Sequence, residues 1–526
     1  MDSQGQRFTL LAVDTPSIQS YIFGSNRLKE NLGASYLVRQ ATENWAFEAL
    51  NHAAGKNNLN DGELDRSAQI EDGDLDTEIL YAGGGNFVVL FRDEAAARSF
   101  THELSRRALT EAPGLRLDIY QEPFIWTGTG LGRAVGQLLQ NMKKARGKKA
   151  SSVPLMGLGV TVMCQSTALP AVAIDDGDPV SAEVLAKRRA AEREANYWLR
   201  SELPPGEGYV YPLDLDELGR SKGERSYIAV VHADGNGMGT LIRKIGEEQD
   251  NRTYIQRMRA FSKNVKSISK AAMKAVIATI TKKTLQGTRL SGTRTVSDLE
   301  FVTDDNKELV LPIRPIVFGG DDTTFVCDGR IGLALAVEYL QAFEREAQQH
   351  SLDLSACAGI AIVKSRYPFA RAYQLSEDLC DEAKKFRRQH FKDGGGALDW
   401  HFTSGGLYDA LEHMRAREYR SGAGSLTLRP VSFRHEGGVR SWDEIERLTV
   451  AFQKEWEDKR NKAKALRDAL REGPEAVARF LSIYEQELPR LAGFEQTGWH
   501  DDMCGYFDAL ELMDIHISLR EKEAQS

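Results

Sequence analysis

The chain has 526 residues, a net charge of −8 and ordinary fractions of hydrophobic (41%) and charged (27%) residues. Its length predicts about two to four domains, each able to bury a core of its own. The negative charge argues against a protein that binds nucleic acid with its whole surface, although a local basic groove is still possible. The sequence contains neither a signal peptide nor a run of 18 apolar residues. We therefore expect a cytoplasmic protein without a membrane partner.

The cysteines of the chain give no sign of a metal or disulfide framework. They are scattered and include no C-x-x-C pair: Cys164, Cys327, Cys357, Cys380 and Cys504. Neither a zinc ribbon nor a set of structural disulfides is expected from this spacing. Cys327 and Cys357 lie in apolar runs, so we interpret them as buried thiols in a reducing compartment.

The first part of the chain alternates apolar runs with helical patterns. Residues 8–13 form an apolar run that ends at Asp14 and predicts a strand. Apolar residues then recur at helical spacing from about 28 to 50, and a polar loop is expected at 51–78. The elements expected next are a strand at 79–82, the turn Gly83-Gly84-Gly85-Asn86, a strand at 87–91, a helix at 93–110 and a strand at 115–120.

The stretch after these elements carries a basic run and a segment with little periodicity. A helix is expected from 133 to about 150, ending in the run Lys143, Lys144, Arg146, Lys148 and Lys149. This run could contact phosphate or RNA, or it could be a solvated helix end. Residues 155–164 predict a strand, and residues 165–225 predict a connector around one charged helix at about 181–201.

The second part of the chain repeats the pattern of the first. A strand at 227–234 ends at Asp234 and is followed by Gly235-Asn236-Gly237-Met238-Gly239. A long helix is expected at 252–284 and a polar insertion at 285–312. The elements expected after it are a hairpin at 316–327 with the turn Gly319-Gly320-Asp321-Asp322, a helix at 330–350, a strand at 356–363, a helix at 366–390 and a helical bundle at 440–518.

Both parts show the order β-α-β-β-α-β, which is typical of a ferredoxin-like sheet with helices on one face. We therefore predict an α+β protein with two ferredoxin-like palm domains in tandem, similar to those of polymerases and cyclases, and a C-terminal helical domain. The alternative is that the shared order is coincidental, because many α+β domains have it. The predicted boundaries are 1–165 for a degenerate first palm, 166–225 for a connector, 226–425 for a catalytic palm and 426–526 for the helical domain.

The hairpin turn carries the most specific chemical signal. Asp321 and Asp322 place two adjacent carboxylates at a turn, which is unfavourable unless a cation neutralises them. Mg²⁺ or Mn²⁺ would suit these oxygen ligands, and the alternative is a solvated acidic turn. In a ferredoxin-like sheet the first strand neighbours the hairpin. Asp234 could then share a metal with both aspartates, with help from the carbonyl of Gly235.

Several small residues near these carboxylates would let phosphate groups approach the backbone. We expect nucleotide contacts from Gly235, Asn236, Gly237, Gly319 and Gly320. Lys384, on the helix after the last strand, could neutralise the β- and γ-phosphates, or it could be an ordinary solvated lysine. His232 is interpreted as a packed strand residue and not as a catalytic base. The first hairpin has Gly-Gly-Gly-Asn, and so it lacks carboxylates.

These motifs resemble a known family, the palm-bearing large subunit of type III CRISPR effectors, called the CRISPR polymerase or cyclic oligoadenylate synthase. The resemblance covers about residues 7–420. It rests on the following segments: Tyr21-Ile22-Phe23, Asn26-Arg27-Leu28-Lys29-Glu30, Gly33-Ala34-Ser35-Tyr36-Leu37-Val38, Asp234 to Gly239, Gly319 to Asp322, and Tyr373-Gln374-Leu375-Ser376-Glu377-Asp378-Leu379.

The resemblance implies two palms that bind ATP where they face each other. Active members of the family join ATP molecules 3′ to 5′ into cyclic oligoadenylates, which switch on effector proteins. On this view Asp234, Asp321 and Asp322 hold the metals. The turn formed by Gly83, Gly84, Gly85 and Asn86 would help to hold the second nucleotide.

The chain also departs from the family pattern. Asn236 stands where many relatives have a second Asp, which would shift metal binding toward Asp234 and Asp321. The chain starts at the first palm strand, so an N-terminal HD nuclease domain and DNA cleavage are not expected. The connector lacks the cysteine pair of the family's zinc-binding insert. We therefore expect a reduced relative, whose product could also be a cyclic dinucleotide or mononucleotide.

Three functions remain open from the sequence. The first is a metal-dependent cyclase or nucleotidyltransferase that uses ATP or another NTP in antiviral defence, with RNA or CRISPR-type protein subunits as activators. The second is a non-catalytic scaffold subunit of a CRISPR-type ribonucleoprotein. The third, a diguanylate cyclase, fits the Gly-Gly-Asp turn but not the paired palms. The intact pair Asp321-Asp322 favours the first, because a scaffold does not need two carboxylates in a glycine turn.

Overall fold

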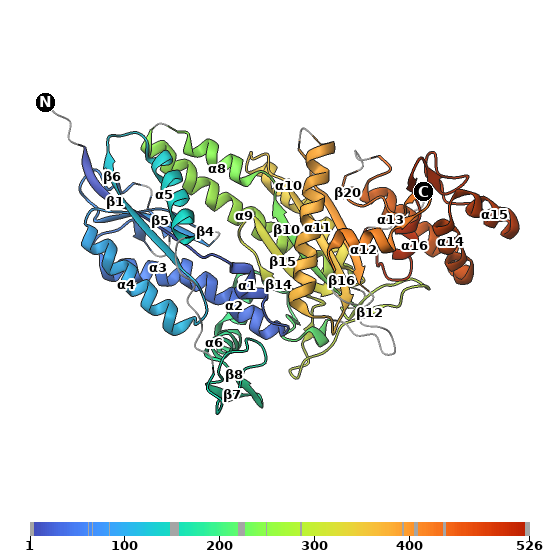
Figure 1. The fold of residues 1–526 in the computed structure, drawn as a ribbon, viewed down its shortest axis with the longest axis horizontal. Coiled ribbons are helices and arrows are strands. Elements are labelled where there is room, and N and C mark those ends of the chain that lie inside the picture. Colours follow the sequence, from blue (N-terminus) through green and yellow to red (C-terminus); the bar gives the residue numbers. More distant parts are fainter. Residues whose placement is uncertain are drawn as a thin grey trace. The chain divides into compact units, whose positions relative to one another are not determined.

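The fold is taken from a computed structural model of the chain (Figure 1). It describes residues 5–60, 63–65, 67–83, 85–147, 157–218, 227–248, 250–284, 287–391, 394–403, 409–434 and 438–520. The chain divides into two compact units. The first comprises Met1–Glu202, Gly237–Ser267 and Gly319–Asp321, and the second comprises Leu203–Asn236, Ile268–Phe318 and Asp322–Ser526. No helix in the described ranges has both the length and the apolarity needed to cross a bilayer.

The first unit is built on a four-stranded antiparallel sheet with the order β4-β5-β1-β6. Its elements are β1 (Gln6–Asp14), α1 (Ile18–Phe23), α2 (Leu28–Thr42), α3 (Asn44–Ala53), β2 (Leu59–Asn60), β3 (Glu63–Leu64), β4 (Thr77–Gly83), β5 (Asn86–Phe91), α4 (Glu94–Glu111), β6 (Asp118–Trp126), α5 (Leu131–Arg146), β7 (Ala173–Asp175), β8 (Asp178–Val180), α6 (Ala182–Ala190), α7 (Asn196–Glu202), α8 (Met238–Gly246) and the start of α9 (Asn251–Lys283).

Helices cover both faces of this sheet. On one face, Phe8 and Leu10 of β1 belong to a core that includes Leu131 of α5 and Tyr254 of α9. On the other face, the ring of Phe87 lies against the ring of Phe100 of α4. The expectation of helices on one face only is therefore wrong for this sheet. Its central strands are buried at successive positions, and such strands need cover on both sides.

A buried carboxylate joins the first sheet to a later part of the chain. Glu78 of β4 has no exposed side-chain surface, and it accepts hydrogen bonds from Arg252 (2.7 and 2.8 Å) and Arg259 (2.8 Å), both on α9. Arg252 also pairs with Glu71. Two guanidinium groups neutralise Glu78, so this buried charge is compatible with folding only when α9 is in place.

The second unit contains a six-stranded sheet with the order β14-β15-β10-β16-β17-β20. Its elements are β9 (Tyr209–Val210), β10 (Tyr227–Gly235), the end of α9, β11 (Arg289–Leu290), β12 (Leu299–Glu300), β13 (Leu309–Val310), β14 (Ile313–Val317), β15 (Asp322–Asp328), α10 (Gly332–Gln349), β16 (Ala356–Lys364), α11 (Phe369–His390), β17 (Ala397–Thr403), α12 (Leu411–Glu418), β18 (Arg420–Ser421), β19 (Gly424–Ser425), β20 (Val431–Ser432), α13 (Trp442–Glu455), α14 (Arg460–Glu472), α15 (Pro474–Tyr484), β21 (Trp499–His500), β22 (Met503–Cys504) and α16 (Phe507–Leu512).

The first four strands of this sheet repeat the order of the first sheet. In both, the strand that opens the repeat lies between the second hairpin strand and the last strand of the repeat. On one face of the second sheet, the hydroxyl of Thr323 is 3.1 Å from that of Ser269 on α9 and 2.7 Å from that of Tyr339 on α10. On the other face, the ring of His232 meets Tyr373 of α11 edge to face. Each face is therefore closed by helices.

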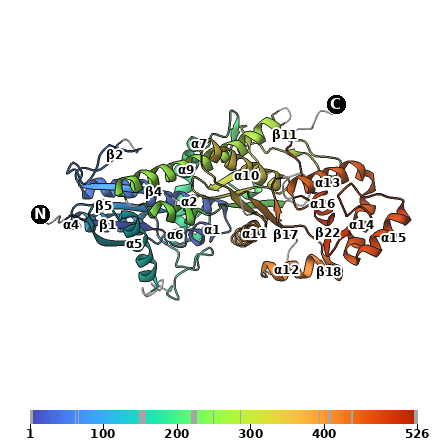
Figure 2. The same cartoon turned by 90° about the horizontal axis from the view of Figure 1, so that it is seen from above.

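The C-terminal part of the second unit is mainly helical, with α13, α14 and α15 visible at its end in Figure 2. Their shared core includes Phe452, Trp456, Leu466 and Phe480. The predicted helices are present, but a small sheet of order β18-β19-β22-β21 was not expected. Cys327 and Cys357 are fully buried, as predicted, and burial raises the pKa of both thiols.

Three local predictions differ from the structure. The expected helix at 28–50 is two helices, because Glu43 (φ −116°, ψ −84°) leaves the helical region between α2 and α3. The expected strand at 155–164 is wrong for its described residues 157–164, where the N–H of Thr161 donates to the carbonyl of Leu158 in a turn (2.9 Å). The helix that carries the basic run ends at Arg146, and Lys148 and Lys149 lie outside the described residues.

Candidate active site

The structure brings two of the predicted carboxylates together. Asp234 is the penultimate residue of β10 and Asp322 begins β15, and the two are directly opposed cross-strand partners. Partners in an antiparallel pair project from the same face of the sheet. Both side chains are about one-third exposed (34%). The prediction that the first strand brings Asp234 to the hairpin is therefore confirmed by the strand order and the register.

A lysine of α11 neutralises one of these carboxylates. The ammonium of Lys384 forms an ion pair with Asp234. Burial lowers the pKa of Lys384, but the Asp234 carboxylate outweighs it, and the pKa is raised above its usual value. The predicted position of Lys384 beside the carboxylates is thus observed, although its expected contact with phosphates stays a prediction.

Two further side chains lie near these carboxylates, His232 of β10 and Glu377 of α11. His232 is buried, with its Nδ1 3.2 Å from Oδ1 of Asp322 and 3.3 Å from Oγ1 of Thr324. Burial lowers the pKa of this histidine. Burial also raises the pKa of Glu377, and the charge of Asp322 adds to the rise although His232 opposes it. His232 is a packed strand residue, as predicted. Its contact with Asp322 was not predicted.

Sequence reasoning missed Glu377, but a signal for it was present. Glu377 precedes Lys384 by seven residues, which is about two helical turns and places both on one face of a helix. A helix that directs Lys384 toward the carboxylates therefore directs Glu377 to the same side. The repeated spacing of polar residues on an otherwise apolar helix face could have identified it.

The first sheet contains an equivalent arrangement that the sequence analysis also missed. Asp14 ends β1 and is the register partner of Asn86, as Asp234 is of Asp322. Arg146, near the end of the helix after β6, pairs with Asp14 and also with Asp118. Each repeat therefore has one aspartate at the end of its first strand and a cation from its last helix. Arg146 is therefore held by two carboxylates although its side chain is 30% exposed, and the contact of the basic run with phosphate or RNA stays a prediction.

The glycine turns adopt backbone conformations that favour glycine. Gly83 (φ 147°), Gly85 (φ 79°) and Gly319 (φ 90°) all have positive φ. Gly84 lies outside the described residues. Gly320 and Asp321 belong to the turn that connects β14 with β15. Both turns can therefore expose backbone groups that a side chain at these positions would crowd.

Helix α9 contacts both turns within the first unit. A Cβ atom at Gly83 would lie 3.0 Å from Oγ of Ser262, which donates to the carbonyl of Ala82 (3.2 Å). A Cβ atom at Gly319 would lie 3.8 Å from Cγ of Lys266. Ser262 and Lys266 are four residues apart and share one face of the helix. The two turns therefore contact α9 one helical turn apart.

The segment after Asp234 is held by its own contacts. Gly235 pairs with Ala356 of β16, and the amide of Asn236 donates to Oγ of Ser355 (3.0 Å). Gly237 (φ 72°) precedes the first residue of α8. The side chain of Asn236 is therefore occupied by a neighbouring strand end, whereas the predicted nucleotide contacts of Gly235, Asn236 and Gly237 stay predictions.

The acidic residues fit a divalent cation in their chemistry. Asp234 and Asp322 offer paired carboxylate oxygens, the ligands that Mg²⁺ and Mn²⁺ prefer. Among the described residues no group of three or more His, Cys, Asp or Glu side chains is arranged to hold a metal ion. Participation of Asp321 and of the Gly235 carbonyl therefore stays a prediction.

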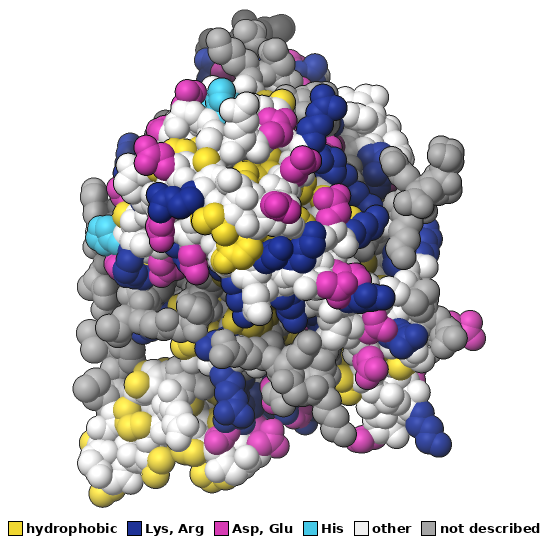
Figure 3. Space-filling model, turned by 90° about the vertical axis from the view of Figure 1, so that its right-hand side faces the viewer, with side chains coloured by type: hydrophobic (Ala, Val, Ile, Leu, Met, Phe, Trp, Pro, Cys, Tyr) yellow, Lys and Arg dark blue, Asp and Glu magenta, His cyan; other side chains and the backbone are white. Residues whose placement is uncertain are grey.

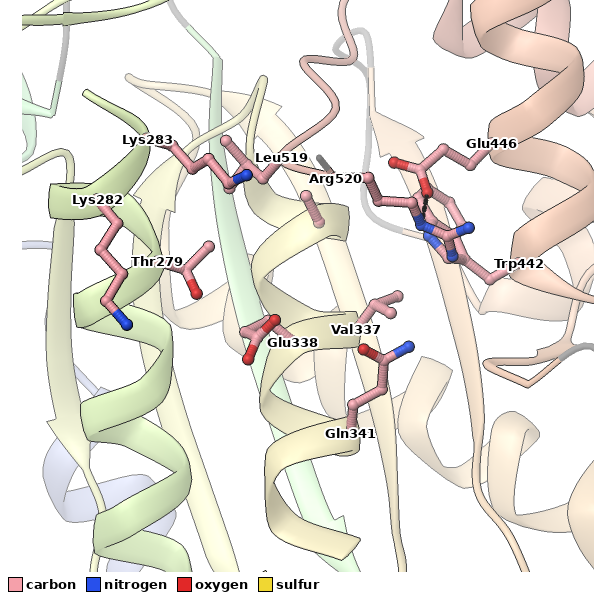
Figure 4. A pocket seen from close by; sticks show the side chains of 11 residues that line it. Thr279, Lys282, Lys283, Val337, Glu338, Gln341, Trp442, Glu446, Leu519 and Arg520 are labelled. Carbon is pink, nitrogen blue, oxygen red and sulfur yellow. Dashed lines mark ion pairs between the residues drawn. The ribbon is translucent and has the colours of Figure 1, made fainter. Parts of the chain in front are cut away.

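The second unit also has a cavity of about 310 Å³ that shares no residue with this site. Lys282 and Lys283 at the end of α9, Glu338 of α10 and Trp442 of α13 line it (Figure 4). Arg520 pairs across its wall with Glu446 (2.5 Å). Lys282 and Lys283 lie in the last turn of α9, where basic residues interact favourably with the helix dipole.

A β-α-β-β-α-β sheet with carboxylates at the end of its first strand and on its hairpin defines a palm domain. Residues 227–392 match the family model described as Cas10/Cmr2, second palm domain. The resemblance found in the sequence is thus confirmed for this domain.

Solved structures extend the likeness to nearly the whole chain. Csm1 from T. onnurineus is 15% identical, with 97% of this chain and 70% of that chain covered and a TM-score of 0.55. A Csm1–Csm4 cassette in complex with AMPPNP gives the same values. A cassette in complex with cA4 is 14% identical, with 97% and 69% covered and a TM-score of 0.53. At these identities the likeness shows a Csm1-like fold. A search of curated proteins found no match.

Proposed function

We propose that the chain is a metal-dependent nucleotidyltransferase with two tandem ferredoxin-like palms, which converts ATP or another NTP into a cyclic oligonucleotide or cyclic nucleotide with release of pyrophosphate. The observation that carries the proposal is the cross-strand pair Asp234–Asp322 beside Lys384, in a domain that matches the Cas10/Cmr2 second palm. Similar structures bind AMPPNP and cA4, according to their descriptions. The proposed role is in antiviral defence.

In this proposal the two turns each hold one nucleotide. The Gly319 turn would hold a triphosphate beside Asp321 and Asp322, and the turn from Gly83 to Asn86 would hold a second nucleotide. Their contacts with a single helix support two neighbouring sites. The 3′-hydroxyl of one nucleotide would attack the α-phosphorus of the other, with pyrophosphate as the leaving group.

The side chains near the carboxylates have separable tasks. Asp234, Asp322 and Asp321 would hold Mg²⁺ or Mn²⁺. When bound, such ions neutralise the charge of the triphosphate and lower the pKa of an attacking hydroxyl. Lys384 would turn from Asp234 to the β- and γ-phosphates. His232 would hold the carboxylate of Asp322 in place through the 3.2 Å contact.

The proposal is tested with the full chain, Mg²⁺ or Mn²⁺ and each labelled NTP, with and without RNA, and with products identified by mass. Asp322→Asn and Asp234→Asn are each expected to lower product formation by at least about 10²-fold. Asp468→Asn is the matched control, because this side chain is 75% exposed and lies on α14. The proposal is wrong if no NTP yields a product under any condition, including candidate RNA or protein activators.

One observation favours the scaffold function as the second candidate. Lys384 already neutralises Asp234, so this part of the site is satisfied without a metal. On the face shown in Figure 3, Lys and Arg side chains are interspersed with Asp and Glu. If the chain is a scaffold, the wild-type chain and Asp322→Asn should bind the partner subunit with equal affinity. Neither should form a nucleotide product.

A further inference from the structure

Lys266 is a basic residue of α9 that lies beside the Gly319 turn. Its Cγ would be 3.8 Å from a Cβ atom at Gly319, so its aliphatic stem runs along the turn. Ser262, one helical turn earlier, lies against the Gly83 turn in the same way. Lys266 therefore lies at one of the two turns to which the proposed function assigns nucleotides, one helical turn from the residue that contacts the other.

The ammonium of Lys266 has a partner that it can exchange. It lies 2.7 Å from Oε1 of Glu43 and is 45% exposed, whereas Glu43 is 16% exposed. An ion pair with one exposed member contributes little to stability, so it is easily replaced by another anion. The exchange is also tolerable for Glu43, because its other oxygen lies 2.9 Å from Arg39 and keeps that charge partner.

Lys384, the cation that pairs with Asp234, is less available. Lys384 neutralises Asp234, and moving it requires that another positive charge replace it there. A triphosphate carries several negative charges and is commonly bound by a lysine next to glycine-rich backbone. Lys266 can supply such a charge without disturbing Asp234 or Asp322.

We propose that Lys266 binds the phosphate groups of a nucleoside triphosphate at the Gly319 turn, leaving Glu43 to Arg39 when the nucleotide enters. The ligand class is a nucleoside di- or triphosphate, because a nucleoside carries no phosphate and a monophosphate carries only the α-phosphate. This inference rests on the proposed function, since it assigns a residue to one of its two nucleotide positions. It makes Glu43 a competitor of the phosphate for the same ammonium.

The test measures binding of ATP and of adenosine by the full chain in calorimetric titrations with Mg²⁺. Lys266→Met keeps the aliphatic stem and removes the charge, so ATP affinity should fall about 10- to 100-fold, as for a lost charged hydrogen bond. Adenosine affinity should change less than about twofold. Lys266→Arg should retain most of the ATP affinity, and Glu43→Gln should raise it by removing the competitor.

Lys263→Met is the matched control. Lys263 lies three residues earlier on the same helix, is 60% exposed and pairs with Glu63 at 3.1 Å. Its substitution should leave ATP affinity unchanged, and circular dichroism should show both methionine variants folded. The inference alone would be overturned if Lys266→Met lost affinity for ATP and adenosine equally, or lost affinity for neither. A wild-type chain that binds no nucleotide would overturn the proposed function and the inference with it.

Discussion

Close packing of α11 on the second sheet gives a sharp prediction for Gly359→Ala. Gly359 lies in β16 as the register partner of His232. A Cβ atom there would lie 2.0 Å from the carbonyl oxygen of Ser376 and 2.3 Å from the backbone nitrogen of Cys380, both on α11. Contacts of a real Cβ atom begin at about 3.0 Å. The helix must therefore move by about 1 Å, since backbone atoms cannot rotate away as a flexible side chain does.

The displacement has an energetic and a functional consequence. Overpacking of this kind costs about 1–3 kcal/mol of folding free energy. Because α11 also carries Lys384, the same movement should draw the ammonium away from Asp234. A misplacement of about 1 Å in a catalytic site can lower the rate about 10²-fold. Gly359→Ala should therefore lose far more activity than its loss of stability explains.

Urea unfolding and the rate of NTP consumption measure the two effects. Gly136→Ala is the control, because its Cβ atom on α5 would meet no atom within 4 Å. In a helix this change should be neutral or stabilising by up to about 1 kcal/mol. An unfolding midpoint for Gly359→Ala equal to that of wild type would refute the close approach of α11.

Three further predictions concern separate parts of the molecule. Gly33→Ala on α2 would place a Cβ atom 1.7 Å from the carbonyl oxygen of Lys187, so urea unfolding should show a loss of about 1–3 kcal/mol. Burial, with help from neighbouring arginines, lowers the pKa of His401 to about 3. As the pH falls below about 6.5, the unfolded chain therefore binds a proton that the folded chain does not. The free energy of unfolding should be about 2 kcal/mol lower at pH 5 than at neutral pH. Denaturant titrations from pH 5 to 8 should show this loss in wild type and a smaller one in His401→Phe. Lys384→Met should lower product formation at least about tenfold in the NTP assay, because Asp234 loses its cation; unchanged product would exclude a role for this lysine.

The features that could be predicted from the sequence are those that depend on the pattern of neighbouring residues. The position of Asp234 near the end of β10 and the glycine hairpin at Asp322 follow from apolar runs and turn residues, and a shared strand order then brings them together. The break at Glu43 could not be predicted, because no Gly or Pro marks it. Its backbone is fixed at a position where its side chain binds Arg39 and Lys266.

Contacts between residues far apart in the sequence were the other feature that could not be predicted. The ion pair of Arg146 with Asp14 joins residues 132 positions apart, and nothing in the basic run distinguishes Arg146 from its neighbours. The contact of His232 with Asp322 likewise depends on register and on the face to which each side chain points. Sequence periodicity gives the face of a strand but not the partner that occupies it.

The buried carboxylate of Glu78 also constrains how the protein can be made. Its partners Arg252 and Arg259 lie 174 and 181 residues later in the chain, within α9. During synthesis the first sheet therefore cannot reach its final stability until α9 has left the ribosome. A fragment that stops at Glu202 would bury Glu78 without either arginine, at a cost of about 3–5 kcal/mol. Expression of the first sheet as a separate piece should therefore include residues 237–267, joined by a linker or supplied as a second chain.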